Sequence, residues 1–360
     1  MNTPSTDRIF ARGSVDKANL NALPGNVTMA DVAQRAGVSL KSVSRVINNE
    51  LHVSEKLRAK VEAAIAELDY VPDTAARSLA GSRSFTIGVL FDNPSPHYTM
   101  KIVNGVYRAC RENRHHLRFD HLDSSFGEAA LLQQLEDILR NGRADGFVLT
   151  PPLCDIAAAV EFLERRGIPI SRIAPVLDPG RTPAVFIDDA GAAGQVADLL
   201  WTLGHRRFGF VGGPPEHYAS TMRRQGFIER LRLHNPDVIV HEANGGFDFG
   251  KGIDAGLELL SARRYPTAIF AANDDSAAGV IVACGRLGLK VPQDVSVFGF
   301  DDSWIAMSVW PYLATVRQPI EDMGHAAAAM LLDRGVDLSQ NPQRQLPFEL
   351  IKRESIAPPK

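Results

Sequence analysis

The segment GVSLKSVSRVIN, from Gly37 to Asn48, contains three serines, two basic residues and no acidic residue. Its apolar residues Val43, Val46 and Ile47 recur three and four positions apart, which predicts a helix with one buried face. Basic and hydroxyl side chains on the opposite face suit the major groove of DNA, because Arg and Lys can bond guanine edges there. The outer face of this predicted recognition helix consists of Leu40, Lys41, Ser44, Arg45 and Asn48.

Cap signals on either side of this segment predict two more helices. Thr28 and Asp31 form a capping-box pattern that begins the first helix. Gly37 ends that helix because glycine tolerates the left-handed conformation, and Ser39 caps the next one. A third helix is expected to begin at Ser54. Its expected buried positions are Leu57, Val61, Ala64, Ile65 and Leu68. Two helices joined by a tight glycine turn, followed by a third, predict a helix-turn-helix domain.

The overall charge gives the chain no general attraction to nucleic acid. The formal net charge is −3 over 360 residues, so DNA binding has to come from a local surface. The cysteines Cys110, Cys154 and Cys284 show no metal-ligand spacing, and we expect them to be small buried residues in a reducing cytoplasm. No metal site and no cofactor is therefore predicted.

The beginning of the chain lacks the apolar run of a signal peptide. Polar and turn residues dominate 1–26, which we expect to be a disordered tail. No later segment approaches the ~18 apolar residues that a membrane-spanning helix needs. The sequence therefore predicts a cytoplasmic protein without a membrane partner.

Short apolar runs alternate with helical patterns from Phe85 onward, among them FTIGVLF, GFVLT, RFGFVGG, TAIFAAN and VSVFGF. This alternation predicts βαβ units and a mostly parallel sheet. The number of runs favours two consecutive doubly wound units over one. We place the break between them near Ile187, where a helix over Ala190–Leu203 restarts the alternation.

These motifs together resemble the LacI/GalR family of bacterial transcription repressors. The resemblance rests on TMADVAQRAGVSLKSVSRVINN (28–49), GHRRFGFVGG (204–213), PTAIFAANDDSAAG (266–279) and VSVFGFDD (295–302), and it covers nearly everything from Val27 to the end. It implies an α/β protein in which an N-terminal helix-turn-helix DNA-binding head and a hinge helix are joined to an effector domain. That domain would be two-lobed, doubly wound and similar to periplasmic binding proteins.

The resemblance also implies domain boundaries. The expected parts are a helix-turn-helix domain over 27–72, a hinge helix and linker over 73–83, and an effector-binding and dimerisation domain over 84–360. Within the last part, the N-lobe would comprise about 84–186 and 317–344, and the C-lobe about 187–316 and 345–356. No leucine heptad follows, as it does in tetrameric members of the family, so we expect a homodimer on a pseudopalindromic operator.

Contacts to double-stranded DNA are implied position by position. Leu40, Lys41 and Arg45 match positions that read bases in the family, and Arg45 would bond a guanine. The family positions that hold phosphates are matched by Thr28, Ser44, Asn48, His52 and Ser54. Leu79, in the hinge segment DTAARSLAG, matches a leucine wedged into the central base step of the operator, which we expect to be CG.

Effector contacts follow from the resemblance in the same way. Arg223, Asn273 and Asp301 match positions that hydrogen-bond the ligand, and Phe247 matches an aromatic residue that stacks on it. The residues expected to line the other lobe are Asn93, Pro94 and Tyr98. Asp274 and Asp302 are expected to cap helices or to support their neighbours.

The identity of the effector stays open at the level of the sequence. Ala174 stands where some sugar-responsive members of the family carry an aspartate, so no particular sugar is named. A sugar or sugar derivative is favoured, although a nucleobase could use the same residues. These residues are compatible with an effector that releases the protein from DNA, an inducer, and with one that recruits it to DNA, a corepressor.

The sequence thus favours a sequence-specific transcriptional regulator, a repressor controlled by a small molecule that binds between two lobes. A periplasmic solute-binding protein without a DNA role would explain the body equally well, but it predicts a signal peptide and no helix-turn-helix. An enzyme is disfavoured, because the sequence contains no P-loop, dinucleotide fingerprint, nucleophile elbow or metal constellation.

Overall fold

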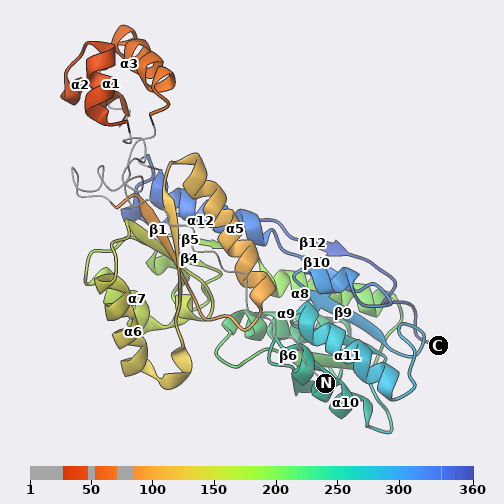
Figure 1. Ribbon diagram of the computed structural model, residues 1–360. Helices are drawn as coiled ribbons and strands as arrows, with labels where there is room; N and C mark the ends of the chain where they lie inside the picture. Colours follow the sequence, from red (N-terminus) through yellow and green to blue (C-terminus); the bar gives the residue numbers. More distant parts are fainter. Residues whose placement is uncertain (1–26, 48–52, 71–83, 334) are drawn as a thin grey trace, which may run out of the picture. The chain divides into compact units, whose positions relative to one another are not determined.

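The computed structural model describes residues 27–47, 53–70, 84–333 and 335–360. The chain divides into two compact units, Met1–Ser82 and Arg83–Lys360 (Figure 1). Among the described residues, no helix combines the length and the apolar character that crossing a membrane requires. In the same part of the chain, no group of His, Cys, Asp and Glu side chains could hold a metal ion. The predicted features that lie outside the described residues are the tail over 1–26, the hinge helix with Leu79, Asn48 and His52.

Three short helices form the described part of the first unit. They are α1 (Met29–Ala36), α2 (Leu40–Ile47) and α3 (Glu55–Glu67). The Thr28 hydroxyl accepts a hydrogen bond from the Asp31 amide, and the Asp31 carboxylate accepts one from the Thr28 amide at 2.8 Å, which confirms the capping box. Gly37 has a φ of +61°, and the Ser39 hydroxyl accepts from the Ser42 amide at 3.2 Å. The end of α1 and the start of α2 are therefore as predicted.

One small apolar core holds these helices together. Val43 and Val46 of α2 are buried in it, whereas Ile47 is half-buried. The start of α3 is confirmed, because the Ser54 hydroxyl accepts from the Leu57 amide at 3.4 Å. The side chains that α3 and the following residue contribute are Val61 and Ala64, which are buried, and Leu57, Ile65 and Leu68, which are half-buried. The helix-turn-helix prediction is confirmed.

Two six-stranded sheets form the second unit, which confirms the predicted pair of doubly wound lobes. The first sheet has the order β11-β5-β4-β3-β1-β2, and its strands pair in parallel. These strands are β1 (Thr86–Phe91), β2 (His116–His121), β3 (Gly146–Leu149), β4 (Ile170–Ile173), β5 (Ala184–Phe186) and β11 (Gln343–Gln345). The helices of this lobe are α5 (Pro96–Glu112), α6 (Glu128–Arg140), α7 (Ala157–Glu164) and α12 (Ile320–Leu332).

The second sheet repeats this order as β12-β10-β9-β8-β6-β7. Only its last strand differs in direction, because β12 pairs antiparallel with β10. The strands are β6 (Phe208–Gly212), β7 (Val240–Asn244), β8 (Ala268–Ala271), β9 (Ser296–Phe300), β10 (Ala314–Arg317) and β12 (Glu349–Ile351). The helices are α8 (Asp189–Thr202), α9 (Tyr218–His234), α10 (Phe249–Leu260) and α11 (Asp274–Arg286). Short 3-10 helices lie at η1 (Ser124–Phe126), η2 (Leu153–Asp155), η3 (Pro179–Arg181), η4 (Trp304–Met307) and η5 (Leu338–Gln340).

The chain passes repeatedly between the two lobes (Figure 1). The first crossover, 187–188, leads from β5 to α8, next to the break predicted at Ile187. The second, 318–319, leads from β10 back to α12, and the third, 346–348, joins β11 to β12. Each lobe is therefore built from segments that are distant in the sequence, and the crossovers form a hinge between the lobes.

Candidate DNA-binding face and interlobe pocket

The outer face of α2 presents most of the predicted base-reading residues. Leu40 is 52% exposed and Lys41 is exposed beside it, whereas Ser44 and Arg45 are half-buried. The sequence of α2 contains no acidic residue, so no carboxylate of this helix faces an approaching phosphate. The two other predicted phosphate contacts that the structure describes, Thr28 and Ser54, are exposed caps of α1 and α3.

A narrow cavity, the interlobe pocket, lies between the two lobes of the second unit. Most of its lining follows the carboxyl ends of parallel strands, where doubly wound proteins bind their ligands. The predicted effector residues that line it are Asn93, Tyr98, Arg223, Phe247, Asn273 and Asp301. Pro94 is not part of this lining, and its contact with an effector stays a prediction. The Asn93 side chain accepts a hydrogen bond from the Ser95 amide at 2.9 Å, and this bend leaves Pro94 exposed.

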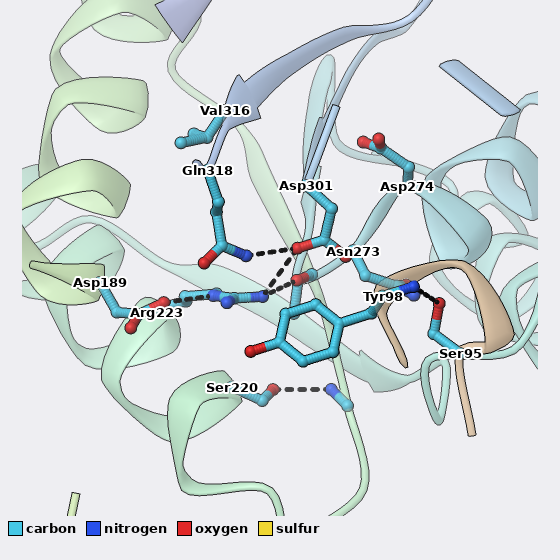
Figure 2. A network of polar contacts seen from close by, with 12 residues as sticks. Ser95, Tyr98, Asp189, Ser220, Arg223, Asn273, Asp274, Asp301, Val316 and Gln318 are labelled. Atoms are coloured by element: carbon cyan, nitrogen blue, oxygen red, sulfur yellow. Dashed lines mark hydrogen bonds and ion pairs between the residues drawn. The ribbon is translucent and has the colours of Figure 1, made fainter. Parts of the chain in front are cut away.

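Arg223, on α9, is the central cation of the pocket (Figure 2). It is only 5% exposed, and its Nε donates to Asp189 Oδ1 at 2.7 Å while its Nη1 donates to the Ala272 carbonyl at 2.6 Å. The guanidinium lies 3.6 Å from the centre of the Phe300 ring, and its Nη1 is 3.8 Å from Asp301 Oδ1. These partners compensate the cost of burying the charge, and they fix the direction of the guanidinium.

Asp301 stands directly after β9 and is buried opposite Arg223. Its Oδ1 accepts a hydrogen bond from Gln318 Nε2 at 2.5 Å (Figure 2). Burial raises the pKa of this carboxyl to about 7, although Arg223 and Gln318 oppose the shift. Its backbone has a φ of +110°, which is strained for a residue with a side chain and costs about 1–3 kcal/mol. Strain and a perturbed pKa at the same residue are typical of a binding site.

Asn273 connects the pocket to an aromatic wall. Its Oδ1 caps α11 by accepting from the Ser276 amide at 2.9 Å, and its Nδ2 donates to the Phe247 carbonyl at 3.2 Å. Phe247 has a φ of +56°, and its ring meets the His217 ring edge-on, with 5.3 Å between the ring centres. Asn273 therefore holds the backbone of the aromatic residue that was predicted to stack on a ligand.

Asp274 and Asp302 both bond to protein groups, as expected. Asp274 is fully buried and accepts from the Thr315 hydroxyl and the Ser303 amide, both at 2.6 Å. The Asp302 carboxylate pairs with Arg317 and Arg353, each at 2.6 Å. Neither carboxylate lines the interlobe pocket.

Several residues of the site were missed by sequence reasoning. Asp189 and Gln318 bond the side chains of Arg223 and Asp301, and His217 lines the pocket with a pKa that burial lowers to about 4. Asp189 follows β5 in the motif IDDAG, an acidic pair after a strand like the pair Asp301 and Asp302 after β9. Gln318 and His217 have no comparable motif, because only the fold brings them to the pocket.

Two hydrogen bonds join the lobes beside this pocket. Ser95, which caps α5, donates its hydroxyl to Asp275 Oδ2 of α11 at 3.2 Å. Lys101 Nζ of α5 donates to the Asp302 carbonyl of the other lobe at 3.0 Å. A ligand that changes the distance between the lobes would make or break these bonds.

Comparisons with known proteins agree with this architecture. Residues 28–73 match the family model "Bacterial regulatory proteins, lacI family", and residues 197–356 match "Periplasmic binding protein-like domain". The chain is 34% identical over 335 residues to the ribose operon repressor of Escherichia coli (strain K12), covering 91% of this chain and 99% of that protein. It is 34% identical over 346 residues to the HTH-type transcriptional repressor PurR of Proteus mirabilis (strain HI4320), covering 92% and 97%.

A solved structure shows the same fold over the same length. The Lac repressor dimer bound to operator and the anti-inducer ONPF is 29% identical to this chain, with a TM-score of 0.73. The match covers 92% of this chain and 99% of that one. The helix-turn-helix head and the two-lobed body therefore occur together in relatives, which leaves no support for a solute-binding protein without a DNA role.

Proposed function

Because the chain belongs to the LacI family of bacterial regulatory proteins, which are transcription regulators and not enzymes, we propose that it represses transcription by placing α2 in the major groove of an operator. The observation that carries the proposal is the outer face of α2, where Leu40 and Lys41 are exposed on a helix without acidic residues. Such a face can approach phosphates and guanine edges without electrostatic repulsion.

Each residue of this face has its own proposed role. Leu40 would make apolar contact with a base, and Lys41 and Arg45 would donate hydrogen bonds to base edges. The proposed phosphate contacts are Thr28, Ser44, Asn48, His52 and Ser54. Leu79 would wedge into a central CG step and bend the duplex. The protein would act in the cytoplasm, where the operator is.

The regulator is proposed to be a homodimer that binds the two half-sites of a pseudopalindrome. An exposed apolar segment between β9 and β10 supports this proposal. Trp310 is 74% exposed there, and Trp304, Met307 and Tyr312 are exposed in the same segment. Monomeric proteins rarely leave large apolar side chains clustered in water, so a second copy of the chain is the proposed cover.

The effector is proposed to be an uncharged, polyhydroxylated molecule of the sugar class. Arg223 directs its Nε to Asp189 and its Nη1 to the Ala272 carbonyl, and the Asp189 and Asp301 carboxyls beside it offset its charge, which disfavours an anionic ligand. Two acidic groups lie against this cation, Asp189 at 2.7 Å and Asp301 at 3.8 Å. Carboxylates of this kind accept hydrogen bonds from hydroxyl groups and repel phosphate or carboxylate ligands.

Regulation follows from the position of the pocket between the lobes. An effector that bonds Asn93 on one lobe and Arg223 on the other has a different affinity for each arrangement of the lobes. This difference in affinity is what shifts the population between DNA-binding and DNA-free states. The name of the similar ribose operon repressor supports a sugar as the controlling molecule.

The experiment that tests this function is selection of bound sequences from a random DNA pool by the purified full chain. The selection is run under four separate conditions: without added ligand, with a mixture of pentoses and hexoses, with the phosphates of these sugars, and with nucleobases. We expect a pseudopalindrome whose recovery changes with uncharged sugars only. Response to nucleobases or sugar phosphates would overturn the effector assignment, and failure to enrich any sequence under every condition would overturn the repressor proposal.

A further inference from the structure

A second cavity adjoins the interlobe pocket where the crossovers join the two lobes; we call it the hinge pocket. This hinge pocket has a volume of about 290 Å³. The residues that make its wall apolar are Pro175, Val176, Pro179, Phe186, Ile187 and Met222. They come from the first lobe, from the first crossover and from α9 of the second lobe, so an occupant of the hinge pocket would contact both lobes.

The two cavities share parts of their walls. Ala174 lines both of them. Asp189 lines the hinge pocket, and its Oδ1 accepts the 2.7 Å hydrogen bond from Arg223, which lines the interlobe pocket. The two cavities therefore adjoin at Ala174 and at the Arg223–Asp189 pair.

A buried pair of charged residues holds the loop that forms the outer wall. Asp155 Oδ1 accepts hydrogen bonds from the amides of Val176 and Leu177, both at 2.8 Å. Arg172 donates to the Leu177 carbonyl at 3.0 Å and to the Pro179 carbonyl at 3.3 Å. Because both side chains are buried and both bond backbone atoms, the loop is fixed in place and does not collapse into the cavity.

The backbone of the same loop supports this conclusion. Ala174 and Asp178 have φ values of +49° and +46°, which residues with side chains rarely adopt. Such conformations persist only where surrounding bonds enforce them. An apolar cavity that is kept open by this many bonds is suited to a ligand group of matching chemistry.

We propose that the hinge pocket receives a compact apolar substituent of the effector, so that the physiological ligand is a glycoside and not a free sugar. The inference rests on the proposed function, since the sugar ring would lie in the interlobe pocket. The substituent would pack against Met222, Val176 and Phe186, in contact with both lobes and with the first crossover. Each buried methylene would raise the affinity roughly fourfold, from a transfer free energy of about 0.8 kcal/mol.

The test compares free sugars with matched glycosides by isothermal titration calorimetry on the full chain. The probes are D-ribose, D-glucose and D-galactose, each free and as the methyl, isopropyl and phenyl glycoside in both anomers. For one sugar we expect the isopropyl or phenyl glycoside to bind roughly tenfold to a hundredfold more tightly than the free sugar. Equal affinity for free and substituted sugar would overturn the hinge-pocket proposal and leave the sugar assignment intact.

A substitution in the hinge pocket tests whether the added affinity of the glycosides arises there. Met222→Trp should obstruct the part of the hinge pocket that Met222 lines, so the glycoside should lose its advantage while the free sugar binds as before. The matched control is Met100→Trp, because Met100 is exposed on α5 and lines neither cavity. An advantage that survives in Met222→Trp would overturn the proposal. Binding of no probe at all would overturn it together with the sugar assignment.

Discussion

The outer face of α2 and the interlobe pocket are both proposed to bind a partner, yet they are built in opposite ways. The face of α2 consists of neighbours in the sequence, held on a helix by short-range caps and a small apolar core. The pocket gathers buried charges from β-strand ends that are separated by more than a hundred residues, such as Asp189 and Asp301. Changes to the face should therefore affect DNA binding alone, whereas changes to the pocket should also affect folding.

Arg223→Met should give the largest effect, because it leaves Asp189 and Asp301 buried without their cation. We expect the free energy of unfolding of the body to fall by about 3–5 kcal/mol, measured by urea denaturation at pH 7.5. Arg224→Met is the matched control, since Arg224 is exposed and pairs with Glu242. It should cost less than about 1 kcal/mol. Equal losses in the two variants would contradict the central role of Arg223.

The second largest effect should be a pH dependence of the unfolding free energy that arises from Asp301 in the pocket. Asp301 has a pKa of about 7 in the folded protein and an ordinary value of 3.8, so the folded state binds its proton more tightly. The stability from this group is present below pH 4 and is lost as the pH rises toward 7, at about 1.4 kcal/mol per pH unit.

Asp301→Asn removes this titration. Relative to the wild type, the variant should gain roughly 2–3 kcal/mol of unfolding free energy between pH 5 and pH 7. The other buried carboxyls titrate in both proteins and cancel in the difference. Parallel stability curves for the two proteins over this range would show that Asp301 keeps an ordinary pKa.

Arg45→Ala tests the outer face of α2, the other of the two regions compared. Loss of a guanine contact should weaken binding to the selected operator by about 1–3 kcal/mol, measured by fluorescence anisotropy. Effector affinity, measured by calorimetry, should be unchanged. As a control for the lost charge, Arg140→Ala on the exposed surface of α6 should leave operator binding intact. A parallel loss of operator and effector binding by Arg45→Ala would indicate misfolding and not a lost base contact.

Thr28→Ala should have the smallest effect. It removes one half of the capping box of α1 and should lower the stability of the head by about 1 kcal/mol, measured by thermal unfolding. Thr221→Ala, an exposed position on α9, provides the comparison. If Thr28→Ala destabilised the body as much as the head, the effect of this cap would not be local.

The same contrast explains which features could be predicted from the sequence. The caps at Thr28, Gly37 and Ser39 were predicted correctly because each depends on neighbours within a few positions. The two lobes were predicted from the alternation of strands and helices. Asp189 and Gln318 were missed because their roles depend on how distant strands pair.

The discontinuous lobes bear on how the chain matures during synthesis. The first lobe lacks α12 and its edge strand β11 until the ribosome has added residues 320–345, near the end of the chain. Until then β5 is an unpaired sheet edge, which could pair with another nascent chain. The helix-turn-helix head, whose contacts are local, can fold long before that point. A truncated product could thus carry a folded DNA-binding head on an incomplete body, and such a product would occupy operators without responding to effector.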